Sequence, residues 1–431
     1  MPDPSTPTLR RELGKWDLTA IGVNQVIGSG VFLLPAALAA NLGGWSWMAV
    51  GLVGALAMLI ALNFAEAASR FEGTGGSYLY TRAAFGRFVS FEVGWMLWAT
   101  RTTSWASVAN GLMDALGYYW PELRAGALRM AALTLLVVVI MLLNIRGVRQ
   151  SAIVVNIFTI AKLTPLVLFV LLGLPYVSVE ALRPDDAVTF QQISAAALLL
   201  IFAYGGYEVI PVPAGEARDP RRAVPFAMIA TIVTVAIVMT AVQVVALGTL
   251  PAIAASRTPL ADAALLFLGG FGALMMTGGA AISMTGNNVG QALSGSRNLF
   301  ALAEQRDLPR AFGHVHPRYH TPDFAIVFTC VITLVLAVSG SFAALAATSA
   351  VTRLLVYAGT CASVLALRRQ GRAPFTIPGG PAVPVLALVI SVAILYGANA
   401  AQLQAGAIAL VLGAVLYAIA RGSARGRIET A

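Results

Sequence analysis

The stretch IGSGVFLLP, residues 27–35, interrupts the first long apolar segment of the chain with two glycines and then a proline. The stretch AYGGYEVIP, residues 203–211, repeats this signature, and in both the proline follows the last glycine by five residues. Glycine weakens a helix by about 1 kcal/mol relative to alanine, and proline removes a backbone hydrogen bond. We therefore expect both segments to be helices that are broken near the middle. The alternative is that the glycines serve close helix packing.

The composition around these stretches is that of a membrane protein. Of 431 residues, 58% are hydrophobic and 11% are charged, against roughly 25% charged in an ordinary soluble domain. Long uninterrupted apolar runs exclude a β-barrel, whose strands alternate in hydrophobicity. The net charge of +9 does not indicate nucleic acid, because the basic residues are distributed by membrane side. We expect an all-α integral membrane protein in a lipid bilayer, with no nucleic-acid partner.

Twelve membrane spans are expected from the apolar runs. Their approximate residues are 17–39, 44–68, 86–112, 127–145, 151–176, 189–213, 224–249, 271–298, 322–340, 342–368, 382–400 and 402–421. With this assignment 21 of the 28 basic residues lie on one side of the membrane, 4 lie on the other and 3 lie within spans. The positive-inside rule makes the richer side cytoplasmic. We expect a multi-pass protein of the cytoplasmic (inner) membrane with both termini in the cytoplasm.

The two broken spans lie five spans apart, which predicts an internal repeat. Because five is odd, the second copy would enter the membrane from the opposite side, giving an inverted-topology repeat. The expected organisation is a single transporter domain over 1–431, with repeats 17–176 and 189–368 and two additional helices in 382–421.

A broken helix exposes backbone groups that suit a zwitterion. The N–H groups of Ser29 and Gly30 would begin a half-helix, where the dipole is positive and a carboxylate is favoured. Backbone carbonyls near the second break would suit an ammonium group, and one ligand that needs both is an α-amino acid. The carbonyl candidates are Phe202, Ala203 and Gly205, and Val26, just before the first break, is a further substrate-binding candidate.

Three basic side chains lie within spans. Lys162 lies about a dozen residues from the start of its span, roughly 18 Å deep in a bilayer about 30 Å thick. A charge there costs about 2.5–3.5 kcal/mol and persists when it faces the bundle interior. Arg101 could pair with Glu208 or face the substrate, and we favour pairing because buried charges are usually paired. Arg353 is expected to be structural and pore-lining.

Several polar residues in the spans are candidate pocket residues. Asn287 and Gln291 share one helix face, and Asn24 precedes the first break with Gln25. Hydrogen bonding between helices is an equal alternative for these amides. Glu66 is expected to anchor the cytoplasmic end of its span. No metal site is expected. The three histidines His314, His316 and His320 lie in one loop, and we expect no acidic or cysteine ligand close to them.

Taken in order, several motifs resemble those of the amino acid–polyamine–organocation (APC) superfamily. They are IGSGVF (27–32), GGSYLY (75–80) with AFG (84–86), FAYGGYE (202–208), EARDPRRAVP (216–225), RNLFALAE (297–304) and RDLP (306–309). The resemblance implies about 12 transmembrane helices with a five-plus-five inverted repeat, discontinuous helices 1 and 6, and alternating access to a central amino acid site.

The resemblance also implies roles for individual residues. The backbone groups named above would bind the substrate, and the Phe202 ring would act as a gate. Lys162 matches a lysine of Na⁺-independent members that occupies the space of sodium in sodium-coupled relatives. Two residues depart from the common pattern: Gly205 suggests a roomier or more flexible break, and Arg101 stands where a neutral residue is more usual.

The function that we expect is secondary active transport of an L-amino acid, independent of Na⁺ and coupled to protons, without a cofactor. Burial disfavours the charged form of a lysine, so Lys162 could load and release a proton, and Glu208 is a second possible carrier. The alternative is an obligatory amino acid exchanger or an exporter of the same fold. An integral-membrane enzyme and a channel are less favoured, because the spans hold no histidine and the paired breaks suit a binding site.

Overall fold

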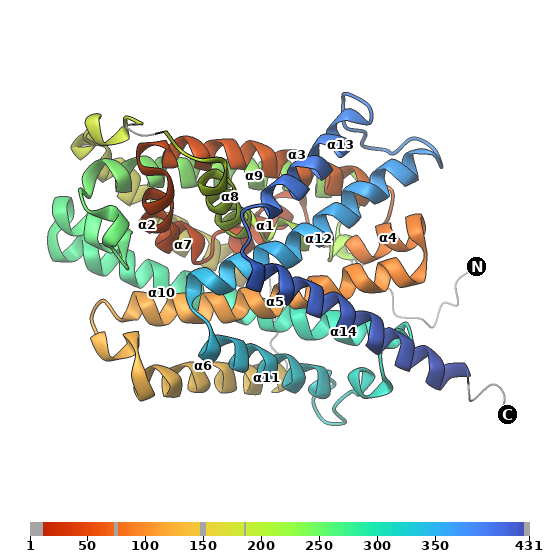
Figure 1. The fold of residues 1–431 in the computed structure, drawn as a ribbon. Helices are drawn as coiled ribbons and strands as arrows, with labels where there is room; N and C mark the ends of the chain where they lie inside the picture. The colour runs from red at the N-terminus through yellow and green to blue at the C-terminus, as the bar shows by residue number, and fades with distance from the viewer. Residues whose placement is uncertain (1–11, 73–75, 147–151, 185–186, 426–431) are drawn as a thin grey trace.

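The computed structural model describes residues 12–72, 76–146, 152–184 and 187–425, and over these ranges the regular elements are helices (Figure 1). The α-helices are α1 (Lys15–Val26), α2 (Gly30–Leu42), α3 (Ser46–Ser69), α4 (Ser77–Phe85), α5 (Arg87–Leu116), α6 (Gly126–Arg146), α7 (Ala152–Gly173), α8 (Phe190–Tyr204), α9 (Pro220–Thr249), α10 (Pro259–Glu304), α11 (Asp323–Ser339), α12 (Phe342–Arg368), α13 (Ala382–Leu395) and α14 (Ala400–Arg425). The 3-10 turns are η1 (Gly43–Trp45), η2 (Pro121–Arg124), η3 (Leu174–Tyr176), η4 (Glu180–Leu182), η5 (Tyr207–Val209), η6 (Ala214–Glu216), η7 (Ile253–Ala255) and η8 (Arg310–Gly313).

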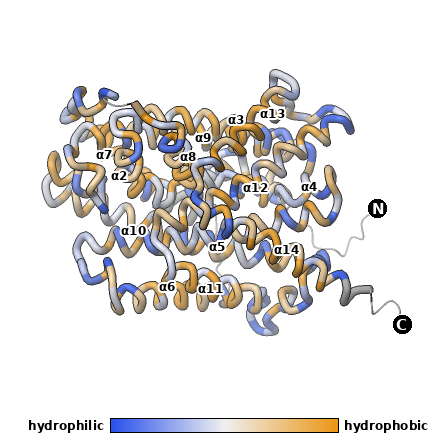
Figure 2. The backbone as a smooth tube through the Cα atoms, in the orientation of Figure 1, coloured by the Kyte–Doolittle hydropathy of each residue, from blue (hydrophilic) through white to orange (hydrophobic). Residues whose placement is uncertain are grey.

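These helices confirm the expected fold class. Eight helical stretches among the described residues are long and apolar enough to cross a membrane, and α11 and α13 are shorter apolar helices. Hydrophobic residues run along α6, α11 and α14 (Figure 2). On α6 the large side chains Leu135, Val139 and Leu142 are exposed, whereas Leu133 and Val137 are buried. A helix that exposes so much apolar surface is suited to contact with lipid.

The first expected span is broken where the glycines predicted. Helix α1 ends at Val26 and α2 begins at Gly30, and the residues between them are not helical. The sixth span is also broken, because α8 ends at Tyr204. Its second half differs from the expectation, since η5 and η6 follow in place of an α-helix. The reason is local: Gly206 has φ 132°, and two prolines that cannot donate a backbone hydrogen bond follow closely.

Some expected boundaries need correction. The span expected at 271–298 is part of α10, which begins at Pro259 and bends at Gly269, where φ is 62° and ψ is −155°. The span expected from 224 begins at Pro220, which needs no backbone donor at the first helical position. Residue 151, where the fifth span was expected to begin, and Gly75 of the loop motif lie outside the described residues.

The helices pack in pairs that link the two halves of the chain. Helix α3 packs along α9, α5 along α10 and α6 along α11, and α6 and α11 lie side by side at one edge of the molecule (Figure 1). Helix α7 packs against α10, while α5 packs against α12. The first three pairs each join helices that hold the same place in the two halves of the chain. The contact of α7 with α10 has its counterpart in the contact of α12 with α5. The two broken spans lie inside this arrangement, where α1 contacts α7, α9 and η5 and α2 contacts α8.

Candidate functional site

The break between α1 and α2 is held by Lys162 of α7. Its side chain is fully buried, and its Nζ donates to the carbonyl of Asn24 at 2.9 Å and to that of Ile27 at 3.0 Å. Ser283 of α10 donates to the Ile27 carbonyl as well, at 3.1 Å. The last carbonyls of a helix have no partner within it and carry the negative end of the dipole. Lys162 therefore both satisfies and neutralises the end of α1.

The start of α2 meets the end of α8 at a close backbone contact. A Cβ on Gly30 would lie 2.9 Å from the Ala203 Cβ and 3.0 Å from its Cα, so bulk at this position would push the two helix ends apart. Ser29 is the N-cap residue of α2, and its buried hydroxyl has no hydrogen-bond partner among the described residues. The first turn of α2 and the last turn of α8 thus lie in direct contact.

A small cavity lies at this contact. Its volume is about 10 Å³, which is close to the space of a single water molecule. Eight of the predicted site residues line it, namely Val26, Ser29, Gly30, Phe202, Ala203, Gly205, Asn287 and Gln291. Four further residues complete the lining: Gln25, Gly28, Ser104 and Val108. An amino acid needs much more room, so the helices around the cavity must separate before one can enter.

The α5 residues of the cavity were missed from the sequence. Ser104 and Val108 follow Arg101 by three and seven residues, which puts all three on one helix face. Because Arg101 was already a candidate, this spacing could have identified its two neighbours.

Two aromatic rings lie beside the cavity at the start of α12. The Phe202 and Phe342 ring centroids are 6.0 Å apart with an interplanar angle of 78°, an edge-to-face contact. Both side chains are buried. Phe342 is the first residue of α12 and contacts the position where a Cβ on Gly111 would point, next to Ser29. Phe202 lines the cavity, and Phe342 packs on its ring.

A buried ionic network holds the second break. Arg353 of α12 binds the Glu208 Oε1 at 2.6 Å, and Arg101 lies 3.3 Å from the same oxygen. The Glu208 Oε2 accepts from the Gly206 N–H at 2.8 Å and from the Tyr357 hydroxyl at 3.2 Å. Pairing of Arg101 with Glu208 is thereby confirmed. The closer partner, Arg353, was not recognised from the sequence as a partner of this carboxylate.

The structure explains the glycine at position 205 differently from our expectation. A Cβ at this position would overlap the Arg353 guanidinium group. The space beside the break is therefore filled by an arginine side chain, and the expectation of a roomier break is wrong. Glycine is needed here because the charged side chain packs directly on the backbone.

A chain of amide hydrogen bonds joins this network to the first break. Arg101 donates to the Gln291 Oε1 at 3.3 Å, and the Gln291 Nε2 donates to Ser104 at 3.1 Å and to the Asn287 Oδ1 at 3.4 Å. Asn287 in turn donates to the Gln25 carbonyl at 3.1 Å. These amides both line the cavity and join helices, so both interpretations from the sequence, a pocket role and hydrogen bonding between helices, apply to them.

Five predicted residues lie outside the cavity lining within the described part of the chain. They are Asn24, Arg101, Lys162, Glu208 and Arg353, which surround the lining residues through the contacts given above. In this conformation they lie behind the lining residues and do not themselves border the cavity.

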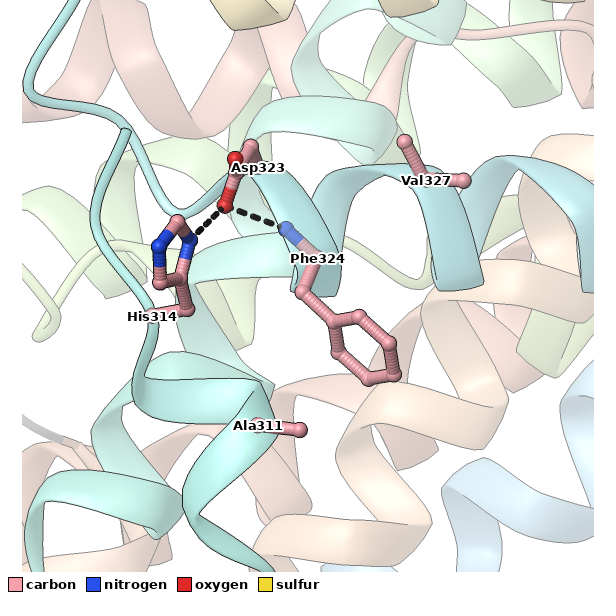
Figure 3. Close-up of a pocket in the computed structure, with 5 residues that line it drawn as sticks. All are labelled: Ala311, His314, Asp323, Phe324 and Val327. Carbon is pink, nitrogen blue, oxygen red and sulfur yellow. Dashed lines mark hydrogen bonds and ion pairs between the residues drawn. The ribbon is translucent and has the colours of Figure 1, made fainter. Parts of the chain in front are cut away.

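Two predictions concern the ends of the bundle. Glu66 anchors the end of α3, as expected, through two hydrogen bonds from Arg368 at 2.6 and 2.7 Å and one from the Ile377 N–H at 2.9 Å. The statement that no acidic residue lies near the loop histidines is wrong. The His314 Nδ1 lies 2.6 Å from Asp323, whose carboxylate also accepts from the Phe324 N–H, beside a shallow surface hollow (Figure 3).

Comparisons with known proteins show the family of the chain. A family model described as amino acid permease matches residues 13–418. An uncharacterized transporter of Mycobacterium tuberculosis is 30% identical, over 96% of this chain and 92% of its own length. The serine/threonine exchanger SteT of Bacillus subtilis is 26% identical, over 88% of this chain and 89% of its own. The branched-chain amino acid permease BcaP of the same species is 25% identical, over 95% and 93%.

Proposed function

The chain belongs to the amino acid permease family of the APC superfamily, and from this premise we propose that it is a secondary active transporter. It carries an L-amino acid across the cytoplasmic membrane by alternating access, with both termini in the cytoplasm. One observation carries the proposal: the positive end of α2 and the negative end of α8 meet at a single buried cavity.

The substrate is held by backbone groups at the two breaks. Its carboxylate binds the N–H groups of Ser29 and Gly30, and its amino group binds carbonyls of Phe202, Ala203 and Gly205. Val26 packs beside the bound molecule. The buried Ser29 hydroxyl, which has no hydrogen-bond partner in the described part of the chain, supports this placement, since such a group is costly and a ligand would complete it. The Phe202 ring is the gate and opens away from Phe342 to admit substrate.

Transport does not use Na⁺, because Lys162 already supplies a cation at the end of α1. Its Nζ lies at hydrogen-bond distance from two carbonyls that could otherwise coordinate an ion. Proton coupling is the preferred energy source, with Lys162 and Glu208 as the candidate carriers. Obligatory exchange and export by the same fold are the alternative, and the similarity to SteT, a serine/threonine exchanger, supports exchange as the first of these.

The experiment that tests transport is uptake into proteoliposomes that hold only this protein. Radiolabelled amino acids should enter with saturable kinetics, and liposomes without protein should show only leak. Unsaturable, amino-acid-independent flux would indicate a channel, and chemical conversion of the labelled compound would indicate an enzyme. Either result would overturn the proposal.

A further inference from the structure

The charges buried around the second break do not balance. Arg101 and Arg353 are each 2% exposed in their side chains and Glu208 is 0% exposed, so the cluster of two cations and one anion carries one excess positive charge. Lys162 is offset separately by the negative end of α1. Uncompensated charge within the membrane is costly and marks a substrate or ion pathway.

The excess charge is assigned to Arg101 by the hydrogen-bond distances. Arg353 lies 2.6 Å from Glu208, and that carboxylate is completed by Tyr357 and a backbone N–H. Arg101 reaches the same carboxylate oxygen only at 3.3 Å, and it donates to the neutral Gln291 at the same distance. Glu208 is thus chiefly the partner of Arg353, and Arg101 is only partly neutralised.

Arg101 lies next to residues that line the cavity. Gln291 and Ser104 both line it: the first accepts a hydrogen bond from Arg101, and the second lies one helical turn further along α5. Two further residues with side-chain amides, Gln25 of α1 and Asn287 of α10, also line the cavity, so this wall is largely polar. This wall can hydrogen-bond a polar side chain, and Arg101 lies directly behind it.

We propose that the substrate is an amino acid with an acidic side chain, of the aspartate or glutamate class, whose side-chain carboxylate is bound by Arg101. This inference rests on the proposed function and deepens it. The α2 and α8 ends account for the carboxylate and ammonium groups that every amino acid has. The remaining positive charge is matched by a second carboxylate, which would replace Gln291 as the partner of Arg101.

The test is equilibrium binding to the purified protein at pH 7, with aspartate, glutamate, asparagine and glutamine compared in one series. The wild type should bind an acid more tightly than its amide. Arg101→Gln should reduce this acid-to-amide preference by about 10- to 100-fold, the size of a lost charge-assisted hydrogen bond. Arg101→Lys should restore part of it. Arg183→Gln is the control, because Arg183 is 65% exposed and pairs with Glu180 away from the cavity.

The outcomes separate this inference from the proposed function. If neutral amino acids bind and acids do not, or if Arg101→Gln leaves the acid-to-amide ratio unchanged, the acidic substrate is wrong while amino acid transport stands. If none of the twenty amino acids binds or is taken up by the wild type, the proposed function itself fails. Unfolding temperatures without ligand show whether each variant is folded. The comparison of acids with their amides in the wild type tests the inference even if a variant does not fold.

Discussion

At the scale of single residues, the two helix breaks are held by buried charged side chains and by a glycine that leaves room for one of them. Lys162 neutralises the end of α1, Arg353 neutralises Glu208, and Gly205 makes room for the arginine. Each of these side chains is buried where an unpaired charge would be costly. The break at span 6 is therefore stabilised by ionic contacts that reach it from α5 and α12.

The contact between Arg353 and Glu208 predicts a large loss of stability when one partner is removed. Glu208→Gln leaves Arg353 and Arg101 buried without a carboxylate, and we expect a loss of about 3–5 kcal/mol in unfolding free energy. Adding Arg353→Met to this variant should recover part of the loss, because one of the two uncompensated cations is gone. Thermal unfolding in detergent measures both, and equal stabilities of the single and double variants would contradict the pairing.

The position of Lys162 predicts transport that is independent of sodium. Initial uptake should be the same in Na⁺ and in choline at fixed pH and membrane voltage, because an ammonium group already occupies the end of α1. The control is the same pair of salts in liposomes without protein. Stimulation by Na⁺ would show that a cation site remains open elsewhere.

At the scale of elements, two broken helices border the cavity, and one aromatic pair lies beside it. The glycines and prolines of 27–35 and 203–211 predicted both breaks, because their effect on a helix is local. The form of the second break could not be predicted, since it depends on Glu208 and on an arginine 145 residues away in the chain. Ser104 and Val108 were missed although their spacing from Arg101 on α5 could have identified them.

The edge-to-face contact between Phe202 and Phe342 predicts a gate. Replacing Phe342 with alanine should expose the cavity, so a cysteine placed at Ser29 should react several-fold faster with a membrane-impermeant thiol reagent. The native Cys330 and Cys361 are buried, which gives a low background. The same cysteine variant with Phe342 intact is the reference. Unchanged labelling rates would place the closing contact elsewhere.

At the scale of the whole molecule, we propose that the two halves are inverted repeats, 17–176 and 189–368, with 382–421 as an added pair. The exchange of helix partners between the halves supports this: α7 with α10 has its counterpart in α12 with α5. Two halves related in this way can rock against each other and open the same cavity to either side. The small volume of the cavity, about 10 Å³, requires such a movement.

Alternation of this kind predicts proton-driven accumulation. In liposomes with no amino acid inside, an inward pH gradient should drive uptake above equilibrium, since Lys162 would change between buried and hydrated surroundings in each cycle. Lys162→Ala should lose the dependence on the gradient and keep some substrate binding. Uptake that occurs only after preloading with amino acid, whatever the gradient, would favour obligatory exchange instead.

The central claim is that the amino acid lies where α2 begins and α8 ends, and binding of labelled substrate to Gly30→Val tests it most directly. Extra bulk at Gly30 meets Ala203 at 2.9 Å, whereas a Cβ on Gly278, also in a membrane helix, meets nothing within 4 Å of it. We expect Gly30→Val to lose binding at least tenfold and Gly278→Val to bind as the wild type does. Wild-type affinity in a folded Gly30→Val protein would contradict this placement and put the substrate elsewhere.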